Sequence, residues 1–134
     1  MIALDTNILL YACDRADSRR QQIAIDLIAN SRDGVLLWQV ACEFVAASRK
    51  LNAQGFTPSD AWNRLTEFLA LLRLVLPTAG VLERGHRLNV THGVSYCDAL
   101  ILAACAEAGV EILYSEDVPG FPTLGALQVV NPFA

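Results

Sequence analysis

The sequence lacks dense charge, paired cysteine motifs and long apolar runs, which are typical of extended, very small and membrane-embedded proteins respectively. Charged residues make up 18% of its 134 residues and hydrophobic residues 54%, which excludes a disordered chain or a coiled coil. The four cysteines form no C-x-x-C pair and no zinc-ribbon spacing, and a chain of this length folds without disulfides. We therefore expect four reduced, buried thiols in a cytoplasmic protein: Cys13, Cys42, Cys97 and Cys105.

No part of the sequence has the form of a targeting or membrane-spanning signal. Asp5 interrupts the apolar start and no basic region precedes it, so no secretory signal peptide is expected. The longest uncharged stretch, Val118–Ala134, contains three prolines, and the other apolar runs are far shorter than the roughly 20 residues of a membrane helix. We expect one soluble domain, residues 1–134, that does not contact a membrane.

The charges are unevenly distributed along the chain. The net charge of −4 does not fit a protein that holds nucleic acid by charge alone. All ten Lys and Arg residues lie at or before Arg87, whereas residues 88–134 carry five acids and no base. Such an acidic block either faces solvent or gathers carboxylates around a cation.

Short apolar runs alternate with helical patterns. Strands are predicted at Met1–Leu4, Val35–Trp38, Leu74–Leu76, Ile112–Tyr114 and Leu127–Val130. Helices are predicted at Ser18–Asn30, Gln39–Leu51, Pro58–Leu72, Thr78–Leu88 and Ser95–Ala108, with a turn at Asp5-Thr6-Asn7, Ser18 as an N-cap and Gly109 as a C-cap. Wholly apolar strands between helices of this length predict an α/β fold with a parallel sheet covered on both faces.

Two acids directly follow predicted strands. Asp5 comes after the first strand, and Asp117 follows Ile112–Tyr114. In open α/β sheets, ligands bind at the carboxyl ends of the strands. An Asx-turn or a helix N-cap explains either residue equally well without any chemistry.

Two further acids lie on apolar helices. Glu43 interrupts the run Val40–Ala47, although a solvated stripe with Gln39 and Lys50 is an alternative. Asp98 completes a Ser95-x-x-Asp98 capping box and also heads an apolar face. If Asp5, Glu43, Asp98 and Asp117 converged, they would repel one another unless they shared a proton or a cation. Oxygen ligands select Mg²⁺ or Mn²⁺, and without these four acids the chain would be electrically neutral.

Several segments carry a resemblance to a known family. They are Ile2–Asn7, Gln39–Phe44, Ser95–Ala99, Leu113–Asp117 and the terminal Val129–Phe133. In order and spacing they resemble the PIN-domain nucleases, and within them the VapC-type toxins of bacterial toxin–antitoxin pairs. Many members carry a hydroxyl residue shortly before the Gln-Val pair, whereas this chain has Leu36-Leu37-Trp38.

The resemblance implies a five-stranded parallel sheet and metal-dependent endonucleolytic cleavage of RNA. The four acids would bind one or two Mg²⁺ or Mn²⁺ ions, and Thr6 and Ser115 match supporting hydroxyl positions. A small antitoxin and a second copy of the chain are the implied protein partners. We assign Asp5 and Asp98 as the principal ligands, with Glu43 and Asp117 binding a second ion or orienting the attacking water.

Other residues have both a functional and a plain structural interpretation. Candidate RNA contacts that are otherwise solvated helix-end charges are Arg15, Arg19, Arg20, Arg49 and Lys50. A zinc pair of His86 and His92 with Cys97 has no matching spacing. Trp38 and Trp62 could stack on bases, but their apolar surroundings predict core positions.

The sequence is also compatible with two other functions. A Mg²⁺-dependent phosphatase would form an aspartyl-phosphate on Asp5, but such enzymes usually carry an acid two residues later, where this chain has Asn7. A catalytically silent RNA- or protein-binding module would keep the same fold and bind without cutting.

Overall fold

The computed structural model describes residues 1–118 and 125–134. Pro119 and Pro122 of the uncharged stretch lie outside the described residues. The sheet has five strands in the order β3-β2-β1-β4-β5, and every neighbouring pair is parallel. The strands are β1 (Ile2–Leu4), β2 (Gly34–Leu37), β3 (Arg73–Val75), β4 (Ile112–Tyr114) and β5 (Gln128–Val130). The predicted five strands and the parallel α/β fold are confirmed.

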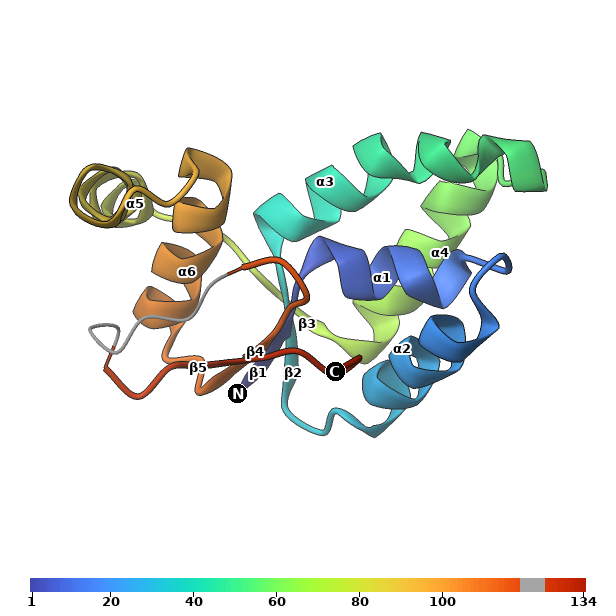
Figure 1. The fold of residues 1–134 in the computed structure, drawn as a ribbon, viewed down its shortest axis with the longest axis horizontal. Coiled ribbons are helices and arrows are strands. Elements are labelled where there is room, and N and C mark those ends of the chain that lie inside the picture. Colours follow the sequence, from blue (N-terminus) through green and yellow to red (C-terminus); the bar gives the residue numbers. More distant parts are fainter. Residues whose placement is uncertain (119–124) are drawn as a thin grey trace.

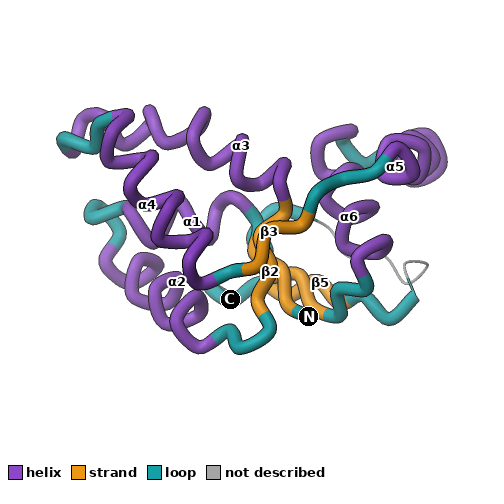
Figure 2. The backbone as a smooth tube through the Cα atoms, turned by 180° about the vertical axis from the view of Figure 1, so that it is seen from behind, coloured by secondary structure: helices purple, strands orange, loops and turns teal. Residues whose placement is uncertain are grey.

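Helices cover both faces of this sheet. They are α1 (Thr6–Cys13), α2 (Ser18–Asn30), α3 (Trp38–Ala47), the 3₁₀ helix η1 (Ser48–Gln54), α4 (Pro58–Leu71), α5 (Ala79–His92) and α6 (Tyr96–Ala108). Helices α1 to α4 lie on one side of the sheet, and α5 and α6 lie together on the other (Figures 1 and 2). Within the described residues, every helix is too short or too polar to traverse a bilayer.

Helix α1 is the main element that the sequence did not predict. The expected turn at Asp5-Thr6-Asn7 is instead the start of this helix, with Asp5 as its N-cap. The Asp5 side chain accepts a hydrogen bond from the backbone N–H of Thr6, which satisfies one of the unpaired donors at the helix start. Because α1 has only eight residues, its apolar pattern is too short to stand out from a buried run.

Several helix ends also differ from their predicted positions. Asp17, and not Ser18, caps α2, because its side chain accepts from the backbone N–H of Arg20. Helix α3 ends at Ala47 and continues as η1, while α5 runs on to His92. Gly109 ends α6 with φ 77°, as its predicted role as a C-cap requires.

The strand order places a topological switch point between β1 and β4. From β1 the chain first adds β2 and β3 on one side, and then crosses over to add β4 and β5 on the other. In open α/β sheets, ligands bind at such a switch point, in the crevice at the carboxyl ends of the strands. Asp5 and Ser115 directly follow these two strands, and the Asp5 N–H still donates to the Tyr114 carbonyl at 3.0 Å.

The core is mainly aliphatic and includes a pair of phenylalanines in contact. Phe44 of α3 and Phe68 of α4 pack edge to face, with ring centroids 5.4 Å apart. The predicted core positions of Trp38 and Trp62 are wrong, since these side chains are 48% and 60% exposed. Their apolar neighbours belong to faces that turn inward, whereas each tryptophan lies on the outer face of its helix.

The cysteines are free, as predicted, but they are not all buried. Cys105 is buried and Cys13 is half-buried, whereas Cys42 and Cys97 are exposed. On α3 the buried face is formed by Val40, Ala41 and Phe44, and Cys42 points away from it. Cys97 lies in the first turn of α6, beyond the edge of the sheet.

Candidate metal centre

Asp5 is the most enclosed acid in the molecule's described part. It is 5% exposed, and both of its carboxylate oxygens accept hydrogen bonds. Oδ1 accepts from the Thr6 N–H at 2.8 Å, and Oδ2 accepts from the Ser115 hydroxyl at 2.7 Å. Asp5 thus serves as the N-cap of α1, and the same carboxylate is held by Ser115 at the switch point.

Glu43 reaches the same place from α3. It is half-buried, and its Oε2 accepts from the Thr6 hydroxyl at 2.8 Å. Its Oε1 accepts from the Gln39 side chain, one helical turn earlier, at 3.1 Å. The hydroxyl that Leu36-Leu37-Trp38 cannot supply to Glu43 is therefore provided by Thr6 of α1.

Asp98 lies in the first turn of α6. The Ser95 hydroxyl accepts from the Asp98 N–H at 3.3 Å, so Ser95 caps the helix as predicted. The capping box is not closed, however, because the Asp98 carboxylate makes no hydrogen bond with the described residues. This half-buried carboxylate is left to face the hollow between α3 and α6.

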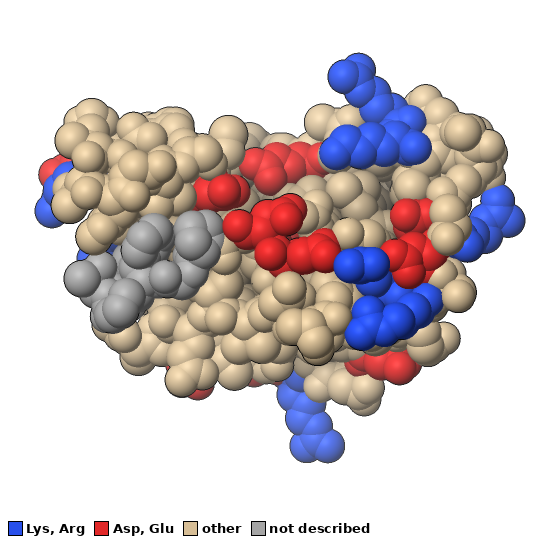
Figure 3. Space-filling model, in the orientation of Figure 1, with Lys and Arg blue, Asp and Glu red and all other residues tan. Residues whose placement is uncertain are grey.

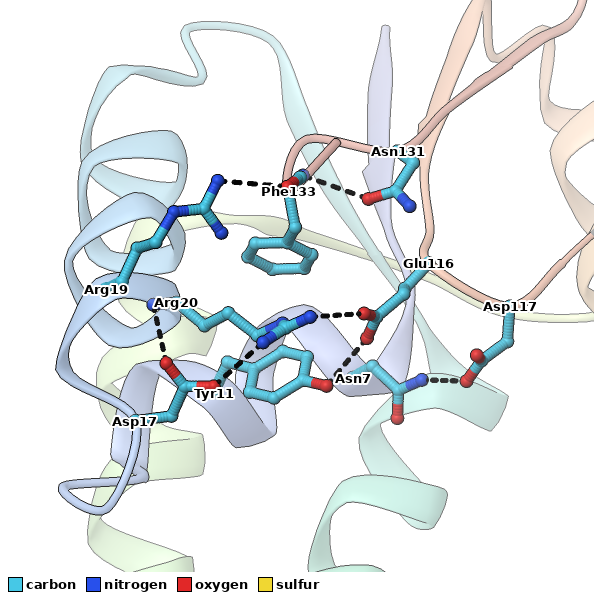
Figure 4. A network of polar contacts seen from close by, with 9 residues as sticks. All are labelled: Asn7, Tyr11, Asp17, Arg19, Arg20, Glu116, Asp117, Asn131 and Phe133. Atoms are coloured by element: carbon cyan, nitrogen blue, oxygen red, sulfur yellow. Dashed lines mark hydrogen bonds and ion pairs between the residues drawn. The ribbon is translucent and has the colours of Figure 1, made fainter.

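Ser115 and Asp117 complete the arrangement after β4. The Ser115 hydroxyl donates to Asp5 and its oxygen accepts from the backbone N–H groups of Asp117 and Val118, at 3.2 and 2.9 Å. Asp117 is exposed and accepts a hydrogen bond from the Asn7 side chain (Figure 4). One hydroxyl therefore holds the buried acid and shapes the loop that carries the exposed one.

All four predicted acids line one cleft of about 430 Å³. Figure 3 shows acidic side chains gathered in the middle of this face, with basic side chains beside them. The residues that line the cleft are Asp5, Thr6, Asn7, Leu10, Glu43, Ala46, Ala47, Arg49, Lys50, Cys97, Asp98, Ile101 and Asp117. The fold therefore brings these four acids, which are distant in the sequence, to the same cleft.

The acids share the cleft without yet converging on one point. Across residues 1–118 and 125–134, no three His, Cys, Asp or Glu side chains are close enough to enclose a metal ion as they stand. Asp5, Glu43 and Asp117 are each turned toward a neighbouring donor, namely Ser115, Thr6 and Asn7. Within the same residues, none of the four acids forms an ion pair with Lys or Arg.

The electrostatics of Asp5 favour a bound positive charge. Burial raises the pKa of the Asp5 carboxyl, and the nearby negative charges of Glu43 and Asp98 raise it further, while the hydrogen bonds from Ser115 and Thr6 act in the opposite direction. An all-oxygen donor set suits a hard divalent ion, and no Lys or Arg of the described residues forms an ion pair with it. The residues present therefore fit Mg²⁺ or Mn²⁺.

A family model agrees with this architecture. The model described as the PIN domain matches residues 2–119, which is most of the chain. The chain belongs to the PIN domain family. No match was found among curated protein sequences.

Solved structures show the same fold at low sequence identity. A toxin–antitoxin complex from Klebsiella pneumoniae matches this PIN domain with a TM-score of 0.68 at 20% identity, covering 98% of both chains. VapC20 from Mycobacterium tuberculosis, described as a Sarcin-Ricin loop cleaving toxin, gives 0.71 at 21% identity over 87% of this chain and 90% of its own. VapBC2 from Rickettsia felis, bound to a DNA fragment from its promoter, gives 0.67 at 18% identity over 98% of this chain and 100% of its own.

Two polar residues at the centre of this PIN domain were not singled out from the sequence. Asn7 holds Asp117, and Gln39 donates both to Glu43 and to the Cys97 carbonyl, at 3.2 Å for the latter. Gln39 therefore ties α3 to α6 across the cleft. Its position one helical turn before Glu43 was a visible signal, but it pointed equally to a solvated stripe.

The five candidate RNA-binding cations fall into two groups. Arg49 and Lys50 line the acidic cleft. The other three are engaged away from it: Arg15 donates to the Gln54 carbonyl at 2.5 Å, Arg19 to the Phe133 carbonyl at 3.0 Å, and Arg20 pairs with Asp17 and Glu116. Of the residues considered for a zinc site, Cys97 lines the cleft, whereas His86 and His92 do not.

Proposed function

We propose that the chain is a divalent-metal-dependent endoribonuclease and the toxin of a type II toxin–antitoxin pair, acting in the cytoplasm as a single nuclease domain over residues 1–134. The observation that carries this proposal is that four carboxylates from four separate elements line one cleft, and that no Lys or Arg in the described part of the chain forms an ion pair with them. The toxins with the same fold support the biological role.

Asp5 and Asp98 are proposed as the principal ligands of Mg²⁺ or Mn²⁺. Glu43 and Asp117 would bind a second ion or orient the attacking water, so that one or two ions are held. When bound, such an ion supplies a Lewis acid that lowers the pKa of a bound water and neutralises charge on the leaving oxygen. The donor set provides this without any nucleophile from the protein.

The residues around the acids orient their carboxylates. Ser115 and Thr6 donate to Asp5 and Glu43, which fixes the direction of both carboxylates. Asp5 has a raised pKa, so it gives up any bound proton when a cation replaces it in the cleft. Cation binding is therefore expected to weaken as the pH falls.

The metal requirement tests the proposed function. The purified chain, incubated with total RNA and Mg²⁺ or Mn²⁺, is expected to produce endonucleolytic fragments, and an excess of EDTA should stop the cleavage completely. Fragments are resolved on a denaturing gel. Binding of RNA without cleavage in either ion would contradict the proposal and favour a silent binding module.

RNA is proposed to enter along the basic edge of the cleft. Lys50 and Arg49 line the cleft together with the acids, and a neighbouring cavity of about 250 Å³ shares Asn7, Leu10 and Lys50 with the cleft. Lys50 therefore stands where the two cavities meet. A single strand that crossed both would pass its phosphates close to this side chain.

Replacing Lys50 with glutamine is expected to weaken RNA binding in a salt-dependent way. Loss of one phosphate contact on a single strand lowers the slope of log K against log salt by about 0.7. Binding is measured by filter retention with the Asp5→Asn variant, which prevents cleavage, at several salt concentrations. Arg32→Gln, which removes an exposed charge away from the cleft, is the control and should leave the slope unchanged.

Two protein partners are part of the proposal. A small antitoxin would place a basic side chain among the four acids, as the charge of the cleft favours. A second copy of the chain would cover exposed apolar side chains near the edge strand β3, where Leu71 is 60% exposed and Leu76 is 66% exposed.

A further inference from the structure

The guanidinium of Arg20 lies at the centre of a polar and aromatic network outside the cleft (Figure 4). From α2, Arg20 pairs with Asp17 at 3.0 Å and with Glu116 at 3.2 Å. Its guanidinium carbon also lies over two aromatic rings, 5.5 Å from the Tyr11 centroid and 5.7 Å from that of Phe133. Electrostatic, stacking and packing contacts therefore all act on this one side chain.

Both carboxylate oxygens of Glu116 are used in this network. Oε1 accepts from Arg20, and Oε2 accepts from the Tyr11 hydroxyl at 2.6 Å. The hydrogen bond to Glu116, together with burial, raises the pKa of Tyr11 to about 12. The Tyr11 hydroxyl therefore stays protonated at neutral pH and remains a donor to Glu116.

The C-terminal tail closes the network from the other side. Phe133 is buried and packs edge to face on Tyr11, with centroids 5.0 Å apart. Arg19 donates to the Phe133 carbonyl, and the Asn131 side chain accepts from the Phe133 N–H at 2.9 Å. Three segments far apart in sequence are thereby tied together around Glu116.

In the loop after β4, Glu116 lies between a residue that holds a cleft acid and a residue that lines the cleft. Ser115 donates to the buried Asp5, while Asp117 lines the cleft next to Asn7. The side chain of Glu116 turns to α1 and α2 and does not line the cleft. Holding Glu116 from outside therefore fixes the direction in which its neighbour Asp117 points.

We propose that Arg20 is a positioning residue that acts through Glu116 to hold Asp117 at the cleft, and that it does not contact RNA. This inference rests on the proposed function, because it assumes that Asp117 takes part in holding the cation. The ion pair with Arg20 also offsets part of the negative charge of Glu116, a fifth acid beside the cleft.

The test compares Arg20→Gln with Arg32→Gln, which removes the same charge from an exposed position away from the cleft. Calorimetric titration with Mn²⁺ is expected to show on the order of 10-fold weaker binding for Arg20→Gln, as for other outer partners of metal ligands. Loss of a positive charge by itself favours cation binding, so charge alone predicts the opposite sign. Arg32→Gln should bind Mn²⁺ as the wild type does.

Steady-state cleavage separates positioning from RNA contact. At a fixed low Mn²⁺ concentration, Arg20→Gln should lower kcat while KM for RNA and its salt dependence stay unchanged. A raised KM with a shallower salt slope and unchanged Mn²⁺ affinity would overturn the inference, because that is the signature of a lost phosphate contact. Wild-type behaviour in both assays would overturn it as well.

A double variant shows whether the effect passes through Asp117. In the Asp117→Asn background, Arg20→Gln should cause no further loss of Mn²⁺ affinity, whereas an equal additional loss would contradict the proposed route. If Arg20→Gln fails to fold, Tyr11→Phe decides the question, since it removes one donor to Glu116 and keeps the ring. Failure of the wild type to bind Mn²⁺ or cut RNA would instead count against the proposed function.

Discussion

Replacing Asp5 with asparagine is expected to lower the rate of RNA cleavage by more than about 100-fold, since loss of an outer partner of a ligand alone costs about 10- to 100-fold. Asparagine keeps the shape and the N-cap to Thr6, but it removes the charge at the centre of the four acids. Initial rates on one RNA in Mn²⁺ measure the effect. A variant that cuts at the wild-type rate would remove Asp5 from the site.

Two controls make this result specific to the cleft. Asp26→Asn applies the same chemical change to an exposed acid of α2 that does not line the cleft, and it should leave cleavage unchanged. Asp98→Asn should reproduce the loss seen with Asp5→Asn. Equal losses in Asp26→Asn and Asp5→Asn would show that the cleft is not the seat of the chemistry.

Asp5→Asn should also stabilise the metal-free protein at neutral pH. Burial raises the pKa of Asp5 in the folded state above the ordinary value of 3.8 that it has in the unfolded chain. At a pH between the unfolded and the folded pKa, the folded state therefore holds a proton that the unfolded chain has released. The free energy of unfolding then falls as the pH rises through that window, and it stays reduced above it. Asparagine does not titrate and escapes this loss.

Urea unfolding in EDTA, from about pH 4 to about pH 8, measures this contribution. Asp17 and Asp60 have lowered pKa values from their hydrogen bonds at helix starts, and they contribute stability that is lost as the pH falls. These opposite contributions are present in both proteins, so the difference between wild type and Asp5→Asn isolates Asp5. A difference that does not grow with pH would contradict the raised pKa of the buried Asp5 carboxyl.

The fold class was predictable because its signals are local. Wholly apolar strands, each bounded by a helix, predict a parallel α/β sheet whatever the strand order. The order itself depends on long-range pairing, so the switch point between β1 and β4 was not visible in the sequence. Position after a strand nevertheless predicted a shared location for Asp5 and Asp117, because parallel strands end at the same edge of a sheet, and both residues line the cleft there.

The outer network around Arg20 was not predictable, because it depends on contacts between segments that are far apart in the sequence. Its members come from α1, α2, the loop after β4 and the C-terminal tail, and none of them has a distinctive local pattern. From the sequence, Arg19 and Arg20 have the same interpretation, as candidate RNA contacts or solvated helix-end charges. In the structure, Arg19 donates to the Phe133 carbonyl and Arg20 to Glu116. Tertiary packing alone distinguishes the two.

Replacing Phe44 with alanine is expected to cost about 3–5 kcal/mol of unfolding free energy, the usual range for a fully buried phenylalanine. Phe44 has no exposed surface and packs edge to face on Phe68, which joins α3 to α4. Trp62→Ala removes a larger ring from α4, but it should change stability by no more than about 0.5 kcal/mol because that side chain is 60% exposed.

Urea denaturation at two protein concentrations measures both variants and separates any effect on association from folding. Equal losses of unfolding free energy for Phe44→Ala and Trp62→Ala would indicate that Trp62 is a core residue, as the sequence predicted, and would contradict its exposed position. A cost for Trp62→Ala that appears only at high protein concentration would place this ring in the interface of the proposed homodimer. Because Glu43 precedes Phe44 on α3, loosening of this helix should also weaken Mn²⁺ binding, and Phe44→Leu should restore most of it.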